Sequence, residues 1–288
     1  MGMTTVTRPA LRYHGGKFRL APWILQFFPE HRVYTEAFGG AAGVLLQKPR
    51  SHGEVYNDLD GDVVNFFRVL RDPVARAHLE VAIRETPYAR EEFEQAWIQT
   101  DDPLERARRL CIRAQMGFGS AGATKGTTGL RVDLKRRFTT AQQDWASYPP
   151  AIAAAGARFA GVLIENRVAV DVLQQHDSPE TLHFVDPPYL FGTRVMRRGG
   201  GYRHELEDED HEDLLAVLLE LQGMVALSGY ASDMYDQALA GWRRFETQSR
   251  ASAGRGTVLR TEVVWLNPAC SAALERGRGG LFAGHGDA

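Results

Sequence analysis

The chain has 288 residues, 44% of them hydrophobic and 24% charged, and its net charge is −2. This composition is ordinary for a soluble globular enzyme, and it excludes a protein whose overall basicity would attract nucleic acid, so that any such surface must be local. The two cysteines, Cys111 and Cys270, have no metal-binding spacing and suit a reducing cytosol, and no apolar run reaches the length of about 18 residues that a membrane span needs. We expect a cytoplasmic protein made of one large domain, or of one domain with a sizeable insertion.

The first part of the chain predicts a strand, a glycine turn and a second strand. A short helix at about 20–28 precedes a strand at 33–38 (VYTEAF), and the glycine turn of FGGAAG follows, from which a helix can begin at 41–48. The second strand, 54–58, ends in acids, and 61–71 is an amphipathic helix. Glycines at such a junction let a ligand approach the backbone, and the first amides of the helix face that ligand.

The acid after the second strand supports a ligand at this turn. Asp58 follows Gly40 by 18 residues, near the separation at which an acid reaches ribose hydroxyls in dinucleotide-binding folds. The pattern is not GxGxxG, which disfavours a nicotinamide site. A tight packing turn without a ligand is the alternative.

Residues 72–150 differ in character from the parts on either side. Helices predicted at 91–98 and 103–116 precede a loop rich in glycine and threonine and then a basic segment, and across 101–150 nine Lys and Arg oppose five acids. Small-residue backbone beside clustered cations suits phosphate contacts. The alternative is a solvated helical face with a mobile loop. The candidate DNA-binding residues are Arg113, Lys125, Arg131, Lys135, Arg136 and Arg137.

The alternation of strands and helices resumes after residue 150. The predicted strands are 161–165, 182–185, 225–228 and 261–266, and the predicted helices are 169–173, 208–222 and 234–239. Residues 192–205 form a loop rich in glycine and arginine that could close over a site. The acids of 205–213 indicate a solvated helix start, and zinc, calcium and P-loop patterns are absent. The alternation predicts an α/β protein with a doubly wound sheet.

The most informative stretch is LHFVDPPY, at 182–189. Its apolar run reads as a buried parallel strand that must stop at two prolines, which places Asp186 at a carboxyl end, where open α/β sheets bind ligands. The residues after the strand suit chemistry on an exocyclic amino group. A carboxylate and the fixed carbonyl of Pro187 can accept the two amine hydrogens, Pro188 stiffens the loop, and Tyr189 can stack on a flat base. A rigid surface turn is the alternative.

Four motifs in this order resemble the Dam-type (alpha-group) DNA adenine methyltransferases. They are RYHGGK at 12–17, EAFGGAAG at 36–43, YNDLDGDVVNFF at 56–67 and DPPY at 186–189, and VVWLNP at 263–268 is similar to the closing strand of the family. Ala37 stands where a proline is common in the family and Ala42 where a further glycine is common. Both departures concern the part of the site that would face the methionine end of a methyl donor.

The resemblance implies S-adenosylmethionine as methyl donor, double-stranded DNA as substrate and neither a metal nor a membrane. It also implies a methyltransferase domain formed by 1–71 and 151–288, interrupted by a mostly helical target-recognition domain at 72–150. Asp186, Pro187, Pro188 and Tyr189 would hold the target adenine. The residues that would bind the donor are Tyr13, Lys17, Glu36, Phe38, Gly39, Gly40, Asp58 and, for its adenine, Asp171. Lys17 would neutralise the donor's carboxylate and Asp58 would accept hydrogen bonds from both ribose hydroxyls.

Three other functions compete with DNA adenine methylation. The same chemistry on cytosine or on RNA is the nearest. An NAD-dependent dehydrogenase would explain the glycine turn and Asp58 but not DPPY. A DNA-binding relative without catalysis is the third.

Overall fold

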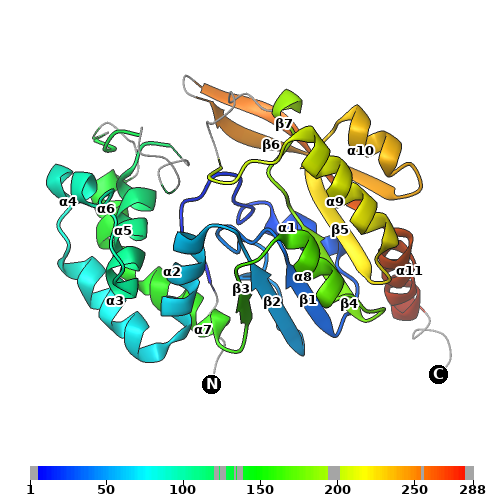
Figure 1. Cartoon of the computed structure of the whole chain (residues 1–288), viewed down its shortest axis with the longest axis horizontal. Helices are drawn as coiled ribbons and strands as arrows, with labels where there is room; N and C mark the ends of the chain where they lie inside the picture. The colour runs from blue at the N-terminus through cyan, green and yellow to red at the C-terminus, as the bar shows by residue number, and fades with distance from the viewer. Residues whose placement is uncertain are drawn as a thin grey trace.

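The computed structural model describes residues 6–119, 123, 128–132, 134, 139–193, 202–253 and 256–282, and within these ranges it contains one seven-stranded sheet. The strand order is β3-β2-β1-β4-β5-β7-β6 (Figure 1). The strands are β1 Val33–Glu36, β2 Gly53–Asn57, β3 Leu163–Glu165, β4 Thr181–Val185, β5 Met224–Tyr230, β6 Arg243–Ala253 and β7 Gly256–Leu266.

The strand order places a topological switch between β1 and β4. The first five strands pair in parallel, and β7 runs antiparallel to both β5 and β6. From β1 the chain moves outward to β2 and β3 on one side, and from β4 to β5 on the other. Adjacent carboxyl ends at such a reversal leave a crevice above the sheet, which is where open α/β sheets bind their ligands.

Both faces of the sheet are covered, which confirms the doubly wound architecture. Along β5, Met224 and Ala226 face one apolar cluster, and Val225 and Leu227 face another. Successive strand side chains point to opposite faces, so alternate residues must enter different layers. A strand that is buried on both faces therefore reads as continuously apolar in the sequence.

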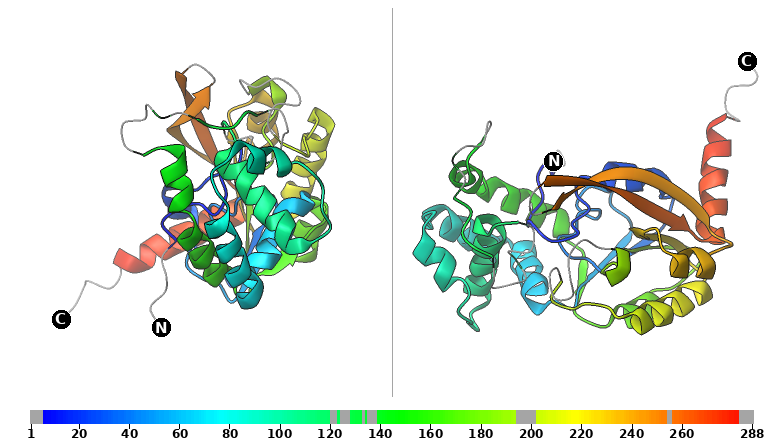
Figure 2. Two further views of the ribbon diagram at one scale, coloured as in Figure 1. Left: turned by 90° about the vertical axis from the view of Figure 1, so that its left-hand side faces the viewer. Right: turned by 90° about the horizontal axis from the view of Figure 1, so that it is seen from above.

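The helices divide between the two faces. The first layer holds α1 Ala21–Ile24, the 3-10 turn η1 Leu25–Phe27 and α11 Pro268–Phe282, and the second holds α8 Ala169–Gln175, α9 Asp208–Glu220 and α10 Asp233–Ala238. Seen from above, α9 and α10 lie on one side of the sheet and α11 on the other (Figure 2).

A group of helices lies beside the β3 edge of the sheet (Figure 1). It comprises α3 Pro73–Glu85, α4 Arg90–Gln95, α5 Pro103–Met116 and α6 Ala141–Ala146, and it packs on α2 Gly61–Arg71 and α7 Pro149–Phe159. Asp72 begins α3 by accepting hydrogen bonds from the amides of Val74 and Ala75, ahead of a proline in the first turn. One apolar cluster runs from these helices to the sheet without interruption.

Several predicted elements differ from the observed ones. The helix expected at 41–48 is wrong, because turns replace it: Ala42 has φ 53°, and the Leu45 amide donates to the Glu36 side chain, which removes a bond of the helical ladder. Helices α3, α6, α7 and α11 and strand β6 were not predicted. The predicted α2 has the observed bounds Gly61–Arg71. No helix in the described part of the chain is long and apolar enough to cross a membrane.

Candidate active site

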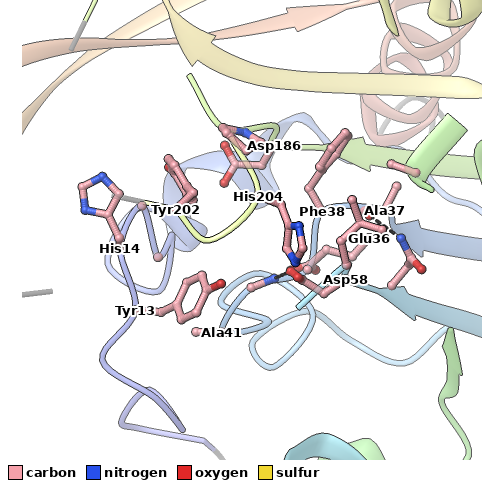
Figure 3. A pocket seen from close by; sticks show the side chains of 18 of the residues that line it. Tyr13, His14, Glu36, Ala37, Phe38, Ala41, Asp58, Asp186, Tyr202 and His204 are labelled. Atoms are coloured by element: carbon pink, nitrogen blue, oxygen red, sulfur yellow. Dashed lines mark hydrogen bonds between the residues drawn. The ribbon is translucent and has the colours of Figure 1, made fainter. Parts of the chain in front are cut away.

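A pocket lies at the carboxyl edge of the sheet, above the switch between β1 and β4 (Figure 3). Its lining comes from five segments, within residues 13–17, 36–43, 57–59, 184–188 and 202–206, together with Ala169. Three of the five follow the ends of β1, β2 and β4, so the parallel strands deliver Glu36, Asp58 and Asp186 to one crevice.

The glycine turn after β1 forms the floor of the pocket. A Cβ on Gly39 would lie 2.1 Å from the ring of Tyr56, and Gly40 has a φ of +46° and faces Tyr13. The Tyr56 hydroxyl donates to the Gly40 carbonyl over 2.7 Å. Glycine is therefore required at Gly39 by space and favoured at Gly40 by the left-handed backbone. The turn leaves open backbone beside the pocket, which is what close approach of a ligand needs.

Glu36 is a buried carboxyl at the end of β1. Its Oε2 accepts hydrogen bonds from the Tyr34 hydroxyl over 2.7 Å and from the Leu45 amide over 2.9 Å. Burial is the largest effect on this group and raises its pKa to about 8, against the lowering by these two hydrogen bonds. Glu36 thus fastens the turn to the strand.

Asp58 closes the other side of the turn. Its Oδ2 accepts from the Gly40 amide over 2.7 Å and its Oδ1 from the Asp60 amide over 2.8 Å. Burial raises the pKa of Asp58 to about 6 in spite of these amides. Each carboxylate oxygen has two lone pairs, so both can accept one further hydrogen bond from a ligand.

Lys17 and Asp186 form the ion pair of the site. The Lys17 Nζ lies 2.9 Å from Asp186 Oδ2, and the two side chains are 7% and 14% exposed. Burial raises the pKa of Asp186 to about 6, and the Lys17 ammonium opposes that rise. Asp186 Oδ1 is buried and has no hydrogen-bond partner among the described residues. One Asp186 oxygen is therefore paired with Lys17, and the other is available to accept a hydrogen bond.

Tyr189 lies beside this pair, and the described pocket lining includes Pro188 but not Tyr189. The Lys17 Nζ lies 4.6 Å from the centre of the Tyr189 ring, and the Tyr230 ring meets it edge-on at 4.4 Å between centroids. The Tyr189 hydroxyl donates to Glu262 Oε2 over 2.9 Å. The ring is thus held by contacts on its face, its edge and its hydroxyl.

Residues 202–206 cover the pocket from the side opposite the sheet. Tyr202 meets the ring of His14 edge-on, and His204 lies beside Asp58, whose pKa it lowers (Figure 3). The Arg203 Nη1 lies 2.8 Å from Asp60 and 3.2 Å from Asp62. Two ion pairs therefore hold this segment to the N-terminal end of α2.

The structure brings all but one of the predicted donor-binding residues to the pocket. Lys17 lines it and contacts Asp186, and its expected contact with the carboxylate of a methyl donor stays a prediction. Asp171 does not line the described pocket; its side chain is 52% exposed and pairs with Arg167. Ala169 lines the pocket instead, because two residues along a helix turn a side chain by roughly 200°. Tyr13, Glu36, Phe38, Gly39, Gly40 and Asp58 all line it.

Sequence reasoning missed Glu262 and the individual residues of 202–206. Glu262 carries a weak signal, an acid in front of the apolar run VVWL of β7. The signal for 202–206 was the glycine- and arginine-rich loop predicted at 192–205, which overlaps these residues but points to no particular side chain.

Two of the six candidate DNA-binding residues lie in the described part of the chain, and both are buried. Arg113 pairs with Asp62 over 2.9 Å and its guanidinium lies over the ring of Trp97, and Arg131 pairs with Asp144 over 3.3 Å. In this conformation both guanidinium groups serve internal ion pairs. Lys125, Lys135, Arg136 and Arg137 lie outside the described residues.

Comparison with known families decides the identity of the site. The model of the D12 class N6 adenine-specific DNA methyltransferases matches residues 13–241, which include all five pocket-lining segments. The chain belongs to this family. It is a site-specific adenine DNA methyltransferase, its substrate is DNA, and its reaction requires a methyl donor.

Other comparisons add little to the family match. A comparison with curated proteins finds no match. The solved structure of precorrin 8W decarboxylase, the product of gene MT0146 of Methanobacterium thermoautotrophicum, is 10% identical to the methyltransferase. That alignment covers 86% of this chain and 88% of the other with a TM-score of 0.32, which is too low to support an argument. Among the described residues of the methyltransferase, no group of His, Cys, Asp and Glu could hold a metal ion.

Proposed function

We propose that the methyltransferase moves a methyl group from S-adenosylmethionine to the 6-amino nitrogen of an adenine flipped out of double-stranded DNA. The observation that supports this most directly is the Asp186 carboxylate, which has one oxygen on Lys17 and one buried oxygen without a partner among the described residues. An acceptor of this kind suits an amine hydrogen, because a buried acceptor gains most from a donor brought by the substrate.

Two parts of the pocket suit the proposed donor: the Asp58 carboxylate, which can bind its ribose, and the backbone of the glycine turn. When bound, S-adenosylmethionine supplies a methyl group on a sulfonium. Asp58 offers a lone pair on each oxygen to the ribose hydroxyls, and its negative charge disfavours a ribose phosphate. Gly39 and Gly40 line the pocket with backbone alone, which permits close approach of a donor.

Asp186 and Pro187 would hold the amine. The lone pair of an aromatic amine is delocalised into its ring, which makes the nitrogen a poor nucleophile. Hydrogen bonds from the amine to Asp186 Oδ1 and to the Pro187 carbonyl favour the tetrahedral nitrogen whose lone pair is free to attack. The N–C bond would form as the bond from the methyl carbon to sulfur breaks, with a thioether as leaving group, and the methylated amine would lose one hydrogen as a proton. Catalysis is then mainly alignment of the nitrogen, the methyl carbon and the sulfur. Cys111 and Cys270 are buried away from the pocket lining, in keeping with direct transfer.

DNA binding is assigned to residues 72–150, and the methyltransferase domain to 1–71 and 151–288. Flipping a base out of the stack costs a few kcal/mol, on the order of 3. Phosphate contacts from Lys125, Lys135, Arg136 and Arg137 would offset part of this cost. The helical group beside the β3 edge belongs to residues 72–150 and would lie next to the bound DNA in this proposal (Figure 1).

The decisive experiment measures transfer from S-adenosylmethionine carrying a labelled methyl group to double-stranded DNA, followed by digestion and mass spectrometry of the nucleosides. N6-methyldeoxyadenosine is the expected product. Label in 4-methyldeoxycytidine, or label in RNA alone, would replace the proposal by one of its competitors. Asp233→Asn, an exposed acid of α10, is the matched control for Asp186→Asn in the same assay.

Ligand-dependent melting tests the donor separately. S-adenosylhomocysteine should raise the melting temperature, and NAD should leave it unchanged, since only a ligand that binds the folded state stabilises it. Stabilisation by NAD alone would support a dehydrogenase-like site.

A further inference from the structure

A buried acid outside the family's DPPY motif lies next to the Asp186 pair. Glu262 is on β7, is 7% exposed, and precedes four residues that are at most 1% exposed, Val263, Val264, Trp265 and Leu266. In the antiparallel register Glu262 lies opposite Tyr230 of β5. A charged side chain in such a position is costly unless it is paired or hydrogen-bonded.

Both oxygens of Glu262 are engaged. The Tyr189 hydroxyl donates to Oε2 over 2.9 Å, and the Ser249 hydroxyl of β6 donates to Oε1 over 3.0 Å. A phenol has one proton, so its bond to Glu262 fixes the direction of the Tyr189 O–H. Without Glu262 that proton could turn to Ser228, 3.4 Å away, or to Asp186, which the hydroxyl also approaches.

Glu262 also acts on Lys17. The Lys17 ammonium contacts Asp186 and lies over the Tyr189 ring, and the charge of Glu262 raises the pKa of that ammonium. One cation is therefore attracted by two carboxylates. Without Glu262, the Lys17 ammonium would be attracted by Asp186 alone. The second oxygen of Asp186 could then join the same ion pair.

We propose that Glu262 is a positioning residue for methyl transfer, which fixes Tyr189 through its hydroxyl and shares Lys17 with Asp186 so that one Asp186 oxygen stays available. The inference rests on the proposed roles of Asp186 and Tyr189. In this proposal Glu262 contacts neither the substrate nor the methyl donor, and it acts through Tyr189 and Lys17.

The first test replaces Glu262 by Gln and compares it with Glu246→Gln. Glu246 lies on the neighbouring strand β6, and its side chain is 47% exposed and pairs with Arg244. We expect Glu262→Gln to lower kcat about 10- to 100-fold, because misplacement of a reacting group by about 1 Å can cost on the order of 100-fold. The donor Kd, by calorimetry, should change less than about twofold, and Glu246→Gln should match the unaltered protein in both. A kcat for Glu262→Gln within about twofold of the unaltered protein overturns the proposal.

A double-mutant cycle tests the route through the hydroxyl. Tyr189→Phe removes only the hydroxyl that donates to Glu262. The double variant with Tyr189→Phe and Glu262→Gln should therefore have about the same kcat as the slower of the two single variants. Effects on kcat that multiply would show that Glu262 acts independently of Tyr189 and would overturn this route. If Glu262→Gln fails to fold, an unchanged kcat in Tyr189→Phe overturns the proposal by itself.

The pH profile tests the charge. The Glu262 charge raises the pKa of Asp186, so Glu262→Gln should move the acid limb of kcat to lower pH. An acid limb of kcat at the same pH in Glu262→Gln and in the unaltered protein would overturn the electrostatic part of the proposal. The titratable groups facing Asp186 are Lys17, Glu36, Tyr189, Tyr230, Tyr235 and Glu262.

Methyl transfer by the unaltered protein distinguishes failure of the proposed function from failure of the Glu262 inference. Absence of methyl transfer by the unaltered protein would overturn the proposed function and this inference together. Transfer by the unaltered protein with an equally active Glu262→Gln would overturn the inference alone.

Discussion

The Lys17 ammonium lies 2.9 Å from the Asp186 carboxylate, although 169 positions separate the two residues along the chain. The pair brings the RYHGGK segment onto the DPPY loop at the switch between β1 and β4. Lys17 lowers the pKa of Asp186 against the effect of burial, which favours the carboxylate, and Asp186 Oδ1 has no hydrogen-bond partner in the described part of the chain.

Asp186→Asn should lower methyl transfer by at least about 100-fold, in the range that loss of a positioned proton acceptor commonly causes. The substitution keeps the shape of the side chain and removes its charge. Donor Kd by calorimetry should stay close to that of the unaltered protein, because Asp58 and the glycine turn remain. Near-full turnover would show that Asp186 does not hold the amine.

Lys17→Gln should move the acid limb of kcat to higher pH. The pKa of Asp186 is about 6 with the ammonium in place, and Lys17 lowers it, so without Lys17 that pKa must rise. Asp186 then becomes protonated at a higher pH and ceases to accept the amine hydrogen. The measurement is kcat from about pH 5 to 9. The shift is opposite in sign to that expected for Glu262→Gln, and a shift of both variants in one direction would contradict the electrostatic account.

Asp58→Asn should weaken donor binding before it affects turnover. Asn keeps one acceptor oxygen, so one hydrogen bond to a charged acceptor is lost, which is worth roughly 1.5–3 kcal/mol, or about 10- to 100-fold in donor Kd. Isothermal calorimetry with S-adenosylhomocysteine measures this directly. Asp213→Asn, an exposed acid of α9, is the control. An unchanged Kd for Asp58→Asn would remove Asp58 from the donor site.

Glu36→Gln should change how stability depends on pH. Burial raises the pKa of Glu36 to about 8 in the folded protein from its ordinary value of 4.5, so the folded state binds its proton more tightly than the unfolded state. The stabilisation is complete below about pH 4.5 and is lost as pH rises through 8. The variant, whose amide oxygen can still accept from Tyr34 and Leu45, should therefore lose less stability than the unaltered protein across this range. Melting temperatures at a series of pH values measure the difference.

Arg136→Ala with Arg137→Ala should lower DNA affinity and flatten its salt dependence. Each lost phosphate contact reduces the slope of log affinity against log salt by about 0.9. Arg32→Ala with Arg50→Ala is the matched control, because these arginines precede β1 and β2 at the opposite edge of the sheet from the pocket. Equal slopes for the two double variants would remove the electrostatic role assigned to 136 and 137.

Local sequence determined the elements whose signals are complete within a few residues. The amphipathic pattern of 61–71 and the proline and arginine pattern of 103–116 gave α2 and α5 with their observed bounds. Strand positions also followed from sequence to within two residues at each end, since the strands predicted at 33–38, 54–58 and 182–185 are β1, β2 and β4. Carboxyl ends of parallel strands meet at one edge, which brings Glu36, Asp58 and Asp186 together. The family and its reaction were readable for the same reason, since three of the four motifs lie at the ends of β1, β2 and β4.

Tertiary structure decided what depends on contacts between distant segments. No local pattern could show that the Leu45 amide bonds Glu36 in place of a helix, that Lys17 turns to Asp186, or that Glu262 of β7 accepts the Tyr189 hydroxyl. The same holds for Arg203, which reaches α2 across 141 positions. Lys17, Glu36 and Glu262 are buried polar side chains, and burying such a group is costly unless it finds a partner, which here comes from a distant part of the chain.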